Sequence, residues 1–262
     1  MPEGHTIHRI SRDHAKWIGG QVIKVSSPQG RFAEEAKRIS GKRLMSIEAH
    51  GKHLFYQWSP RRFMHVHLGL YGKFRLHQNP PPLPRGAVRI RMQAKERTID
   101  LNGPNCCELI DVAGYQQIKQ RLGEDPLRED ADVKTVWNRV RTSRAPIGTL
   151  LSNQSVVAGV GNIYRAELLF LVGVHPNRRG CELEKPVFDA LWGLTVKLLK
   201  VGLKYNRIIT VTRDEADKPL SRLSRQERIH IYKRENCPKC DGPISCWELA
   251  NRKIYACERC QA

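Results

Sequence analysis

Residues 237–260 read CPKCDGPISCWELANRKIYACERC, with cysteines in the pattern Cys237-x2-Cys240-x16-Cys257-x2-Cys260. Two Cys-x-x-Cys pairs about 15–20 residues apart are typical of a tetrahedral zinc site, because each pair forms a turn that aims two thiolates at one point. The intervening residues can form a hairpin that carries the second pair back to the first. The stretch therefore predicts a small zinc-binding hairpin near the end of the chain.

The zinc in such a site is structural, because four cysteine ligands leave no open position for a catalytic water. Disulfides and four unlinked thiols are the competing interpretations. The start Met1-Pro-Glu-Gly has no signal-peptide core, so we expect a reducing cytoplasm, where zinc thiolates are more common than disulfides. We call the four cysteines of this pattern the zinc quartet. The chain has four further cysteines, and we expect most of them to be small core residues. These further cysteines are Cys106, Cys107, Cys181 and Cys246. Zinc ribbons serve many nucleic-acid proteins, so this site alone does not name a function.

Basic residues dominate the first and last parts of the chain. The net charge of the chain is +19. Residues 1–91 contain 17 Lys/Arg and 5 Asp/Glu, residues 92–199 contain 14 and 13, and residues 200–262 contain 14 and 8. The cations are interleaved with apolar residues, as on a folded surface. Nucleic acid is the partner that this charge favours, and a solubilising surface is the alternative. No stretch approaches about 18 apolar residues, so we expect no membrane partner.

The first half of the chain has the spacing of a helix followed by many strands. Residues 3–19 have helical periodicity, which Gly19-Gly20 ends. The segments that read as strands are 22–26, 43–49, 53–57, 64–68, 72–76, 88–94 and 97–101. Short strands at this spacing predict a β-sandwich or barrel.

Helical periodicity prevails in the second half. It recurs at 114–122, 132–142, 150–155, 163–173 and 185–204, whereas 206–230 is polar and reads partly as loop. Gly123-Glu124-Asp125-Pro126 marks a boundary. We therefore expect an α+β protein with an N-terminal β-sandwich domain at 1–123, a helical domain at 124–230 and a zinc finger at 231–262.

Pro2 and Glu3 offer a nucleophile beside a carboxylate. Methionine before proline is commonly removed, which leaves Pro2 with a free secondary amine. An α-amino group titrates near 7.7–8.0, so roughly a quarter of it is neutral at pH 7.4, against about 0.1% of a lysine. A neutral amine can attack a carbonyl-like carbon and form an iminium, while Glu3 transfers protons. Taken alone, the pair is also compatible with an ordinary chain start.

Two turns carry further candidates. Gly51-Lys52-His53-Leu54 enters a strand, where Lys52 is either a surface cation or a functional amine. Leu68-Gly69-Leu70-Tyr71-Gly72 frames a large apolar residue and an aromatic residue with glycines. Leu70 and Tyr71 either pack in a hairpin turn or form a wedge that enters a base stack.

A third candidate is the segment from Gln154 to Glu167. Gly159 and Gly161 permit tight turns between two helices. Asn162 is then expected to cap a helix that begins at Ile163, and an exposed helix N-terminus with Arg165 in its first turn favours a phosphate. The alternative is a helical hairpin with a capping asparagine.

These motifs together resemble the formamidopyrimidine-DNA glycosylase and endonuclease VIII family of base-excision repair enzymes. The resemblance covers essentially the whole chain, through the start, the turns at 51–54 and 67–72, the segment 159–169 and the terminal finger. It implies a catalytic helix leading the β-sandwich, a helix–two-turn–helix domain, and a bifunctional DNA glycosylase and AP lyase. It also implies a cytoplasmic, nucleoid-associated monomer that binds damaged DNA with one Zn²⁺ and no small-molecule cofactor.

The resemblance also implies roles for single residues. Pro2 attacks C1′ of the damaged nucleotide, Glu3 donates and shuttles protons, and Lys52 contacts a phosphate near the lesion. DNA binding falls to Leu70, Tyr71 and Asn162, together with Arg252, five residues before the third zinc cysteine. A loop within 206–230 is expected to cap the lesion.

Within the family, the chain start and the Leu-Tyr pair are more similar to the endonuclease VIII branch of actinobacterial type. That branch favours oxidised pyrimidines and performs β,δ-elimination. His5 and Thr6 stand where many relatives have Pro-Glu, so the second N-terminal carboxylate is missing. The rival hypotheses are a zinc-finger protein that recognises damaged or abasic DNA without catalysis, and a ribosomal or transcription zinc-ribbon protein.

Overall fold

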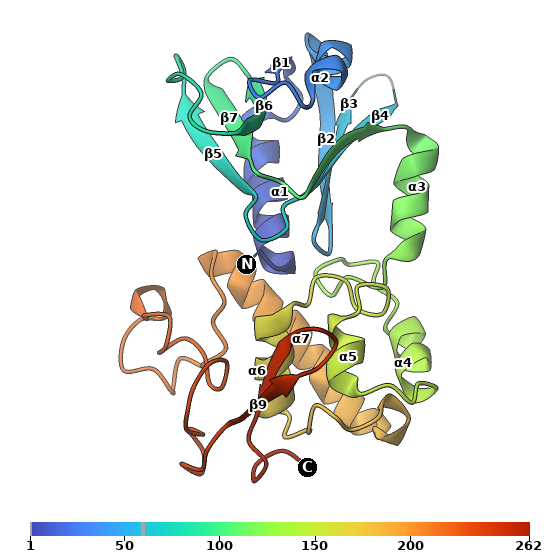
Figure 1. Ribbon diagram of the computed structural model, residues 1–262, viewed down its shortest axis with the longest axis vertical. Helices are drawn as coiled ribbons and strands as arrows, with labels where there is room; N and C mark the ends of the chain where they lie inside the picture. The colour runs from blue at the N-terminus through green and yellow to red at the C-terminus, as the bar shows by residue number, and fades with distance from the viewer. Residues whose placement is uncertain (1, 59–60) are drawn as a thin grey trace. The chain divides into compact units, whose positions relative to one another are not determined.

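The computed structural model describes residues 2–58 and 61–262, which divide into two compact units (Figure 1). The first unit contains Pro2, Glu3 and most of residues 7–121; the second contains residues 4–6 and 122–262. The first turn of the leading helix thus belongs to the second unit. None of the described helices is long and apolar enough to cross a bilayer.

The first unit is built on antiparallel strands in the order β5-β7-β6-β1-β2-β3-β4-β8. Their bounds are β1 Val22–Ser26, β2 Lys42–His50, β3 His53–Trp58, β4 Arg62–His67, β5 Lys73–Gln78, β6 Val88–Gln93, β7 Arg97–Asn102 and β8 Cys106–Ile110. β1 pairs with both β2 and β6 and so joins two four-stranded halves. Side chains from both halves form one buried core, as the sequence pattern of a sandwich predicts.

Helices complete this unit: α1 Gly4–Ile18 from residue 7 onward, α2 Ala33–Ile39 and α3 Val112–Arg121. α1 buries Ile7 and Ile18 in the core of the sandwich, and Gly20, with φ of +73°, follows its end. α3 packs over one end of the β3-β4-β8 layer. There the ring of Tyr115 stacks on Phe63 with centroids 4.3 Å apart.

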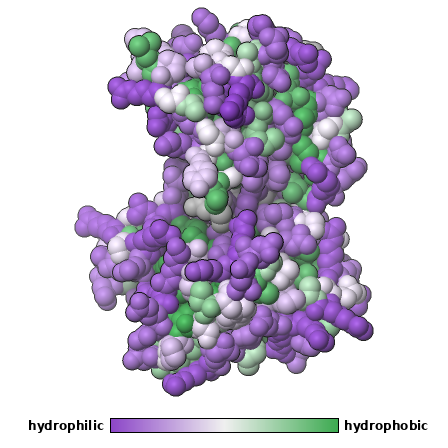
Figure 2. All heavy atoms as spheres, viewed as in Figure 1, coloured by the Kyte–Doolittle hydropathy of each residue, from purple (hydrophilic) through white to green (hydrophobic). Residues whose placement is uncertain are grey.

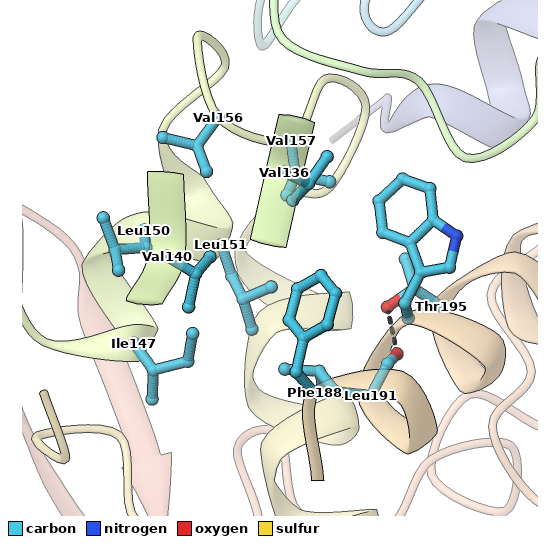
Figure 3. A pocket seen from close by; sticks show the side chains of 11 residues that line it. Val136, Val140, Ile147, Leu150, Leu151, Val156, Val157, Phe188, Leu191 and Thr195 are labelled. Carbon is cyan, nitrogen blue, oxygen red and sulfur yellow. Dashed lines mark hydrogen bonds between the residues drawn. The ribbon is translucent and has the colours of Figure 1, made fainter. Parts of the chain in front are cut away.

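The second unit is helical. Its helices are α4 Val133–Arg141, α5 Ile147–Ser152, α6 Asn162–Leu171 and α7 Lys185–Tyr205, with short 3₁₀ turns at Gly180–Glu182 and Leu220–Arg222. Figure 3 shows side chains from α4, α5 and α7 converging on a small apolar hollow in its core. At its edge the Thr195 hydroxyl is satisfied within its own helix, donating to the Leu191 carbonyl at 2.7 Å.

The chain ends in a hairpin of β9 Ser245–Glu248 and β10 Lys253–Ala256. Ile254, Tyr255 and Cys257 pack with Ala166 and Phe170 of α6. The hairpin is therefore part of the second unit. Its own core is too small to stand without such packing or a metal.

The sequence predicted the fold class and most elements correctly. It missed α2 and β8, and it placed α5 three residues late. The expectation for the unassigned cysteines was wrong for Cys181 and Cys246, which are exposed. Hydrophilic side chains cover most of the face that Figure 2 shows, as the charge predicts.

Candidate active site and nucleic-acid interface

Glu3 is a fully buried carboxylate directly before α1, with 0% of its surface exposed. Glutamate is rarely this buried unless its environment is specialised, and such carboxylates mark functional sites more often than surface ones do. Pro2 beside it is only partly buried. The chain start thus sets an accessible residue next to a carboxylate shielded from water.

The next residues are fixed by close packing within the second unit. The Gly4 amide donates to the Gly159 carbonyl at 2.8 Å, and a Cβ on Gly4 would lie 2.9 Å from the Gly159 Cα. His5 is buried edge-on against the Tyr164 ring, and burial lowers its pKa to about 4. A Cβ on Gly202 would meet the His5 ring at 2.9 Å. His5, which replaces the expected proline, is thus a neutral packing residue.

Lys52 lies in the tight turn between β2 and β3. Gly51 has a φ of +57°, a conformation that glycine adopts without strain. Lys52 lies near His67 of β4: burial, His65 and the charge of Lys52 together hold the pKa of His67 below its ordinary value. The turn therefore presents Lys52 beside a neutral imidazole.

Leu70 and Tyr71 project from a rigid turn after β4. The Gly72 amide donates to the Leu68 carbonyl at 3.0 Å, and Gly69 has a φ of +66°. Leu70 is 62% exposed and Tyr71 85% exposed. Large apolar side chains held outward in this way commonly mark a binding surface. The alternative of a packed hairpin turn is excluded for both side chains.

Asn162 is not the helix cap that the sequence predicted. Gly161, with an extended φ of −121°, takes the N-cap position, and Asn162 is the first residue of α6. The side-chain NH₂ group of Asn162 instead donates to the backbone carbonyl of Lys253 at 2.8 Å. The side-chain oxygen of Asn162 accepts from the Arg165 guanidinium at 2.6 Å. The side chain thus joins α6 to the terminal hairpin.

Arg165 is fully buried, so it cannot be the phosphate ligand that its position in the first turn suggested. Its guanidinium donates to the carbonyl of Leu249 at 3.2 Å and to that of Lys253 at 3.3 Å. A buried guanidinium needs such acceptors. Arg165 holds the turn end of the hairpin against α6.

Arg252 stands exposed at the tip of that hairpin. The Leu249 amide donates to the Arg252 carbonyl at 3.0 Å, across a loop of Ala250 and Asn251 that both have positive φ. Such a two-residue loop matches the twist of the flanking strands and fixes their register. The cation of Arg252 is therefore presented on a defined turn.

The zinc quartet converges as its spacing predicts. Sγ atoms of Cys237 and Cys260 are 3.8 Å apart, and those of Cys240 and Cys257 are 3.5 Å apart. Tetrahedral Zn–S bonds of about 2.3 Å place sulfurs about 3.8 Å apart, whereas a disulfide requires about 2.05 Å. The four thiols fit one tetrahedral ion, and the four are free cysteines.

Glu167 is a central residue that sequence analysis missed. It is 0% exposed and accepts from the Thr210 hydroxyl at 2.6 Å and from the amides of His230, Ile231 and Tyr232 at 2.7–2.8 Å. Burial alone would raise its pKa, yet these bonds and the His230 side chain hold that pKa below its ordinary value. Glu167 therefore fastens both ends of the segment 211–229. Its place in the 159–169 motif was the available signal.

Two family models match the chain. The formamidopyrimidine-DNA glycosylase N-terminal domain matches residues 1–105, and the H2TH domain of the same enzymes matches residues 122–214. The chain belongs to the formamidopyrimidine-DNA glycosylase family. Members of this family are DNA glycosylases that are also AP lyases, so the chain is an enzyme of DNA repair.

Relatives from two branches of the family match over essentially the whole chain. Endonuclease 8 1 of Mycobacterium tuberculosis is 46% identical over 268 residues, which cover 100% of both chains. Formamidopyrimidine-DNA glycosylase of Thermomicrobium roseum is 27% identical, and the match covers 100% of this chain and 99% of that protein. Among solved structures, the Lactococcus lactis Fpg protein with N7-benzyl-Fapy-dG DNA has a TM-score of 0.82 at 25% identity, with 99% of each chain covered.

Proposed function

We propose that this enzyme removes oxidised bases, with a preference for pyrimidines, through a covalent link between Pro2 and the sugar. The observation that carries the proposal is the pairing of an accessible N-terminal proline with the fully buried Glu3. The 46% identity to a protein named endonuclease 8 favours the pyrimidine branch. Met1, whose removal the mechanism requires, lies outside the described residues.

In the proposed reaction, the neutral secondary amine of Pro2 attacks C1′ and the bond from C1′ to the base breaks. The proline nitrogen releases its N–H proton to solvent, and the departing base takes up a proton from solvent. Opening of the C1′–O4′ bond turns the link into an iminium, and the proton for O4′ comes from Glu3. Loss of a C2′ proton then expels the 3′ phosphate, and loss of the C4′ proton in a second elimination expels the 5′ phosphate. Water hydrolyses the iminium and restores the amine.

DNA binding is proposed for both units. Lys52 contacts a phosphate near the lesion, while Leu70 and Tyr71 fill the space of the extruded nucleotide; unstacking costs a few kcal/mol, and damage lowers that cost. Asn162 and Arg252 bind phosphates from the second unit, the latter as part of a finger that holds one structural Zn²⁺. We expect a monomer acting on the nucleoid in the cytoplasm, with no small-molecule cofactor.

The test is reductive trapping. Borohydride should link processed protein covalently to DNA with an abasic site, and an extra residue before Pro2 should abolish the link because an acylated nitrogen cannot attack. Glu3→Gln should keep DNA binding yet lose base excision, since an amide cannot donate the proton. Full base excision by protein with a blocked N-terminus would overturn the mechanism. Lys52 would then be the nucleophile to test. DNA binding without trapping or excision by processed protein would favour the non-catalytic rival.

A further inference from the structure

One face of the β2-β3-β4-β8 layer concentrates ionisable side chains that the proposed reaction does not use. Strand register pairs His50 with His53, His53 with His67, His67 with Cys106, and His65 with Glu108. Because residues two apart share a face, all of these side chains stand on the same side of the sheet. We call this set the histidine face: His50, His53, His65, His67, Cys106 and Glu108.

Three members of the histidine face bring possible ligand atoms together. His65 Nδ1 lies 2.8 Å from a Glu108 carboxylate oxygen and 3.7 Å from the Cys106 sulfur. The three ligand atoms all lie within 4.8 Å of one another. Among residues 2–58 and 61–262, the zinc quartet is the other group of this kind.

The geometry is close to that of a tetrahedral metal centre. Bonds of about 2.0–2.1 Å to nitrogen and about 2.3 Å to sulfur place those two ligand atoms about 3.6 Å apart. The separation between His65 and Cys106 already matches this value. The Glu108 oxygen would have to withdraw from His65 by about 0.6 Å, and its half-exposed side chain has room to do so.

We propose that His65 Nδ1, the Cys106 thiolate and a Glu108 oxygen form a second Zn²⁺ site, with a fourth position open to water. The mixed set of nitrogen, sulfur and oxygen donors suits an ion of borderline softness. The exposed Glu108 provides access from solvent. Unlike the four-thiolate finger, this site has three protein ligands, the number found where zinc keeps an exchangeable position.

Binding has a defined proton balance. The Cys106 thiol releases one proton to solvent as its sulfur bonds the metal. In the metal-free chain a neutral His65 donates from Nδ1 to Glu108, so its Nε2 accepts from His53 Nδ1 at 2.9 Å. A metal on Nδ1 moves the His65 proton to Nε2. His53 then shifts its own proton from Nδ1 to Nε2, so that its Nδ1 accepts from His65. Since His53 follows Lys52, the metal would stiffen the turn that carries this lysine.

The test uses full-length protein with a zinc-loaded finger, dialysed against Zn²⁺ and assayed by elemental analysis. Wild type should bind two equivalents of zinc, and Cys106→Ser should bind one. Cys181→Ser, which removes an exposed thiol elsewhere, should bind two. Glu108→Gln, at a half-exposed site less critical to folding, should weaken the second equivalent by more than about tenfold.

Two further readouts identify the ligands. Co²⁺ added to the zinc-loaded protein should give a thiolate charge-transfer band that Cys106→Ser lacks and Cys181→Ser retains. Zinc should also move the His65 proton from Nδ1 to Nε2 in nitrogen NMR spectra and slow amide exchange at residues 51–54. A single zinc equivalent in wild type, or an unchanged second equivalent in folded Cys106→Ser and Glu108→Gln, would overturn the site.

Discussion

The side-chain amide of Asn162 donates to the backbone carbonyl of Lys253 at 2.8 Å, which joins the first residue of α6 to the first residue of β10. Arg165 holds the other side of Asn162 and reaches the same carbonyl. Two proposed phosphate ligands, Asn162 and Arg252, are therefore coupled through the backbone of the hairpin.

Asn162→Ala should weaken binding to all DNA sequences alike and should also lower stability. Backbone contacts carry no sequence information, and the lost partners of buried polar groups cost about 1–3 kcal/mol. Binding titrations and thermal melts separate the two effects. Asn177→Ala, an exposed asparagine, is the control. A loss of stability without a loss of binding would make Asn162 a purely structural link.

Cys257→Ser should remove the finger zinc and abolish tight DNA binding while most helical circular dichroism remains. The finger packs on one side of α6, whereas Leu168 and Leu169 anchor that helix in a separate core. Cys246→Ser, an exposed cysteine of the same hairpin, should change neither property. Unchanged DNA affinity in protein that has lost the zinc would contradict a role for the finger in binding.

Leu70→Ala combined with Tyr71→Ala should slow excision of a paired lesion more than cleavage at a preformed abasic site. An abasic nucleotide has no base to unstack, so it needs less compensation from a wedge. Single-turnover rates on both substrates measure the difference. Leu83→Ala, which truncates another exposed leucine, should affect neither rate. Equal losses on both substrates would indicate a structural turn.

Hydrogen-exchange protection of residues 211–229 should fall as the pH rises from about 6 to about 8.5. Although burial opposes it, Glu167 and Glu215 raise the pKa of His230 by bonding its charged form. The stabilisation that protonated His230 gives the segment is complete below its unfolded-state pKa of about 6.5. It is lost as the pH rises through the raised pKa of His230 in the folded protein. Protection is compared after correction for intrinsic exchange rates.

His230→Gln should remove this pH dependence and leave the segment less protected at pH 6. His77→Gln, which changes a histidine paired with Asp100 in the other unit, should behave like wild type. If protection in the wild type did not change with pH, the charge of His230 would have no part in holding the segment.

Sequence patterns were most informative where a single physical rule dominates. The cysteine spacing gave the convergent quartet, and period-two alternation gave seven of the eight strands. β8 was missed because it pairs only with β4 at the edge of the layer, so both of its faces are partly exposed and its pattern does not alternate. The seven-residue α2 is too short for a clear helical period.

Side-chain partners far apart in the chain could not be predicted. A helix cap differs from a first helical residue by one position, and this difference decides what Asn162 bonds. Arg165 looked like a surface cation because its acceptors lie 84–88 residues later. Glu167 and the histidine face likewise depend on strand pairing and loop anchoring that local patterns do not encode.

The contact between Gly4 and Gly159 bears on how freely the protein can be altered by directed evolution. Position 4 is the first residue of α1, yet a side chain there would force the facing backbone to move, because a Cβ would lie 2.9 Å from the Gly159 Cα. Saturation mutagenesis should therefore recover only glycine at position 4, even in a screen for folding alone. A change at position 159 cannot rescue a substitution there, because the obstructing atoms are main chain. The start of this chain is constrained by shape as well as by the chemistry proposed for its proline.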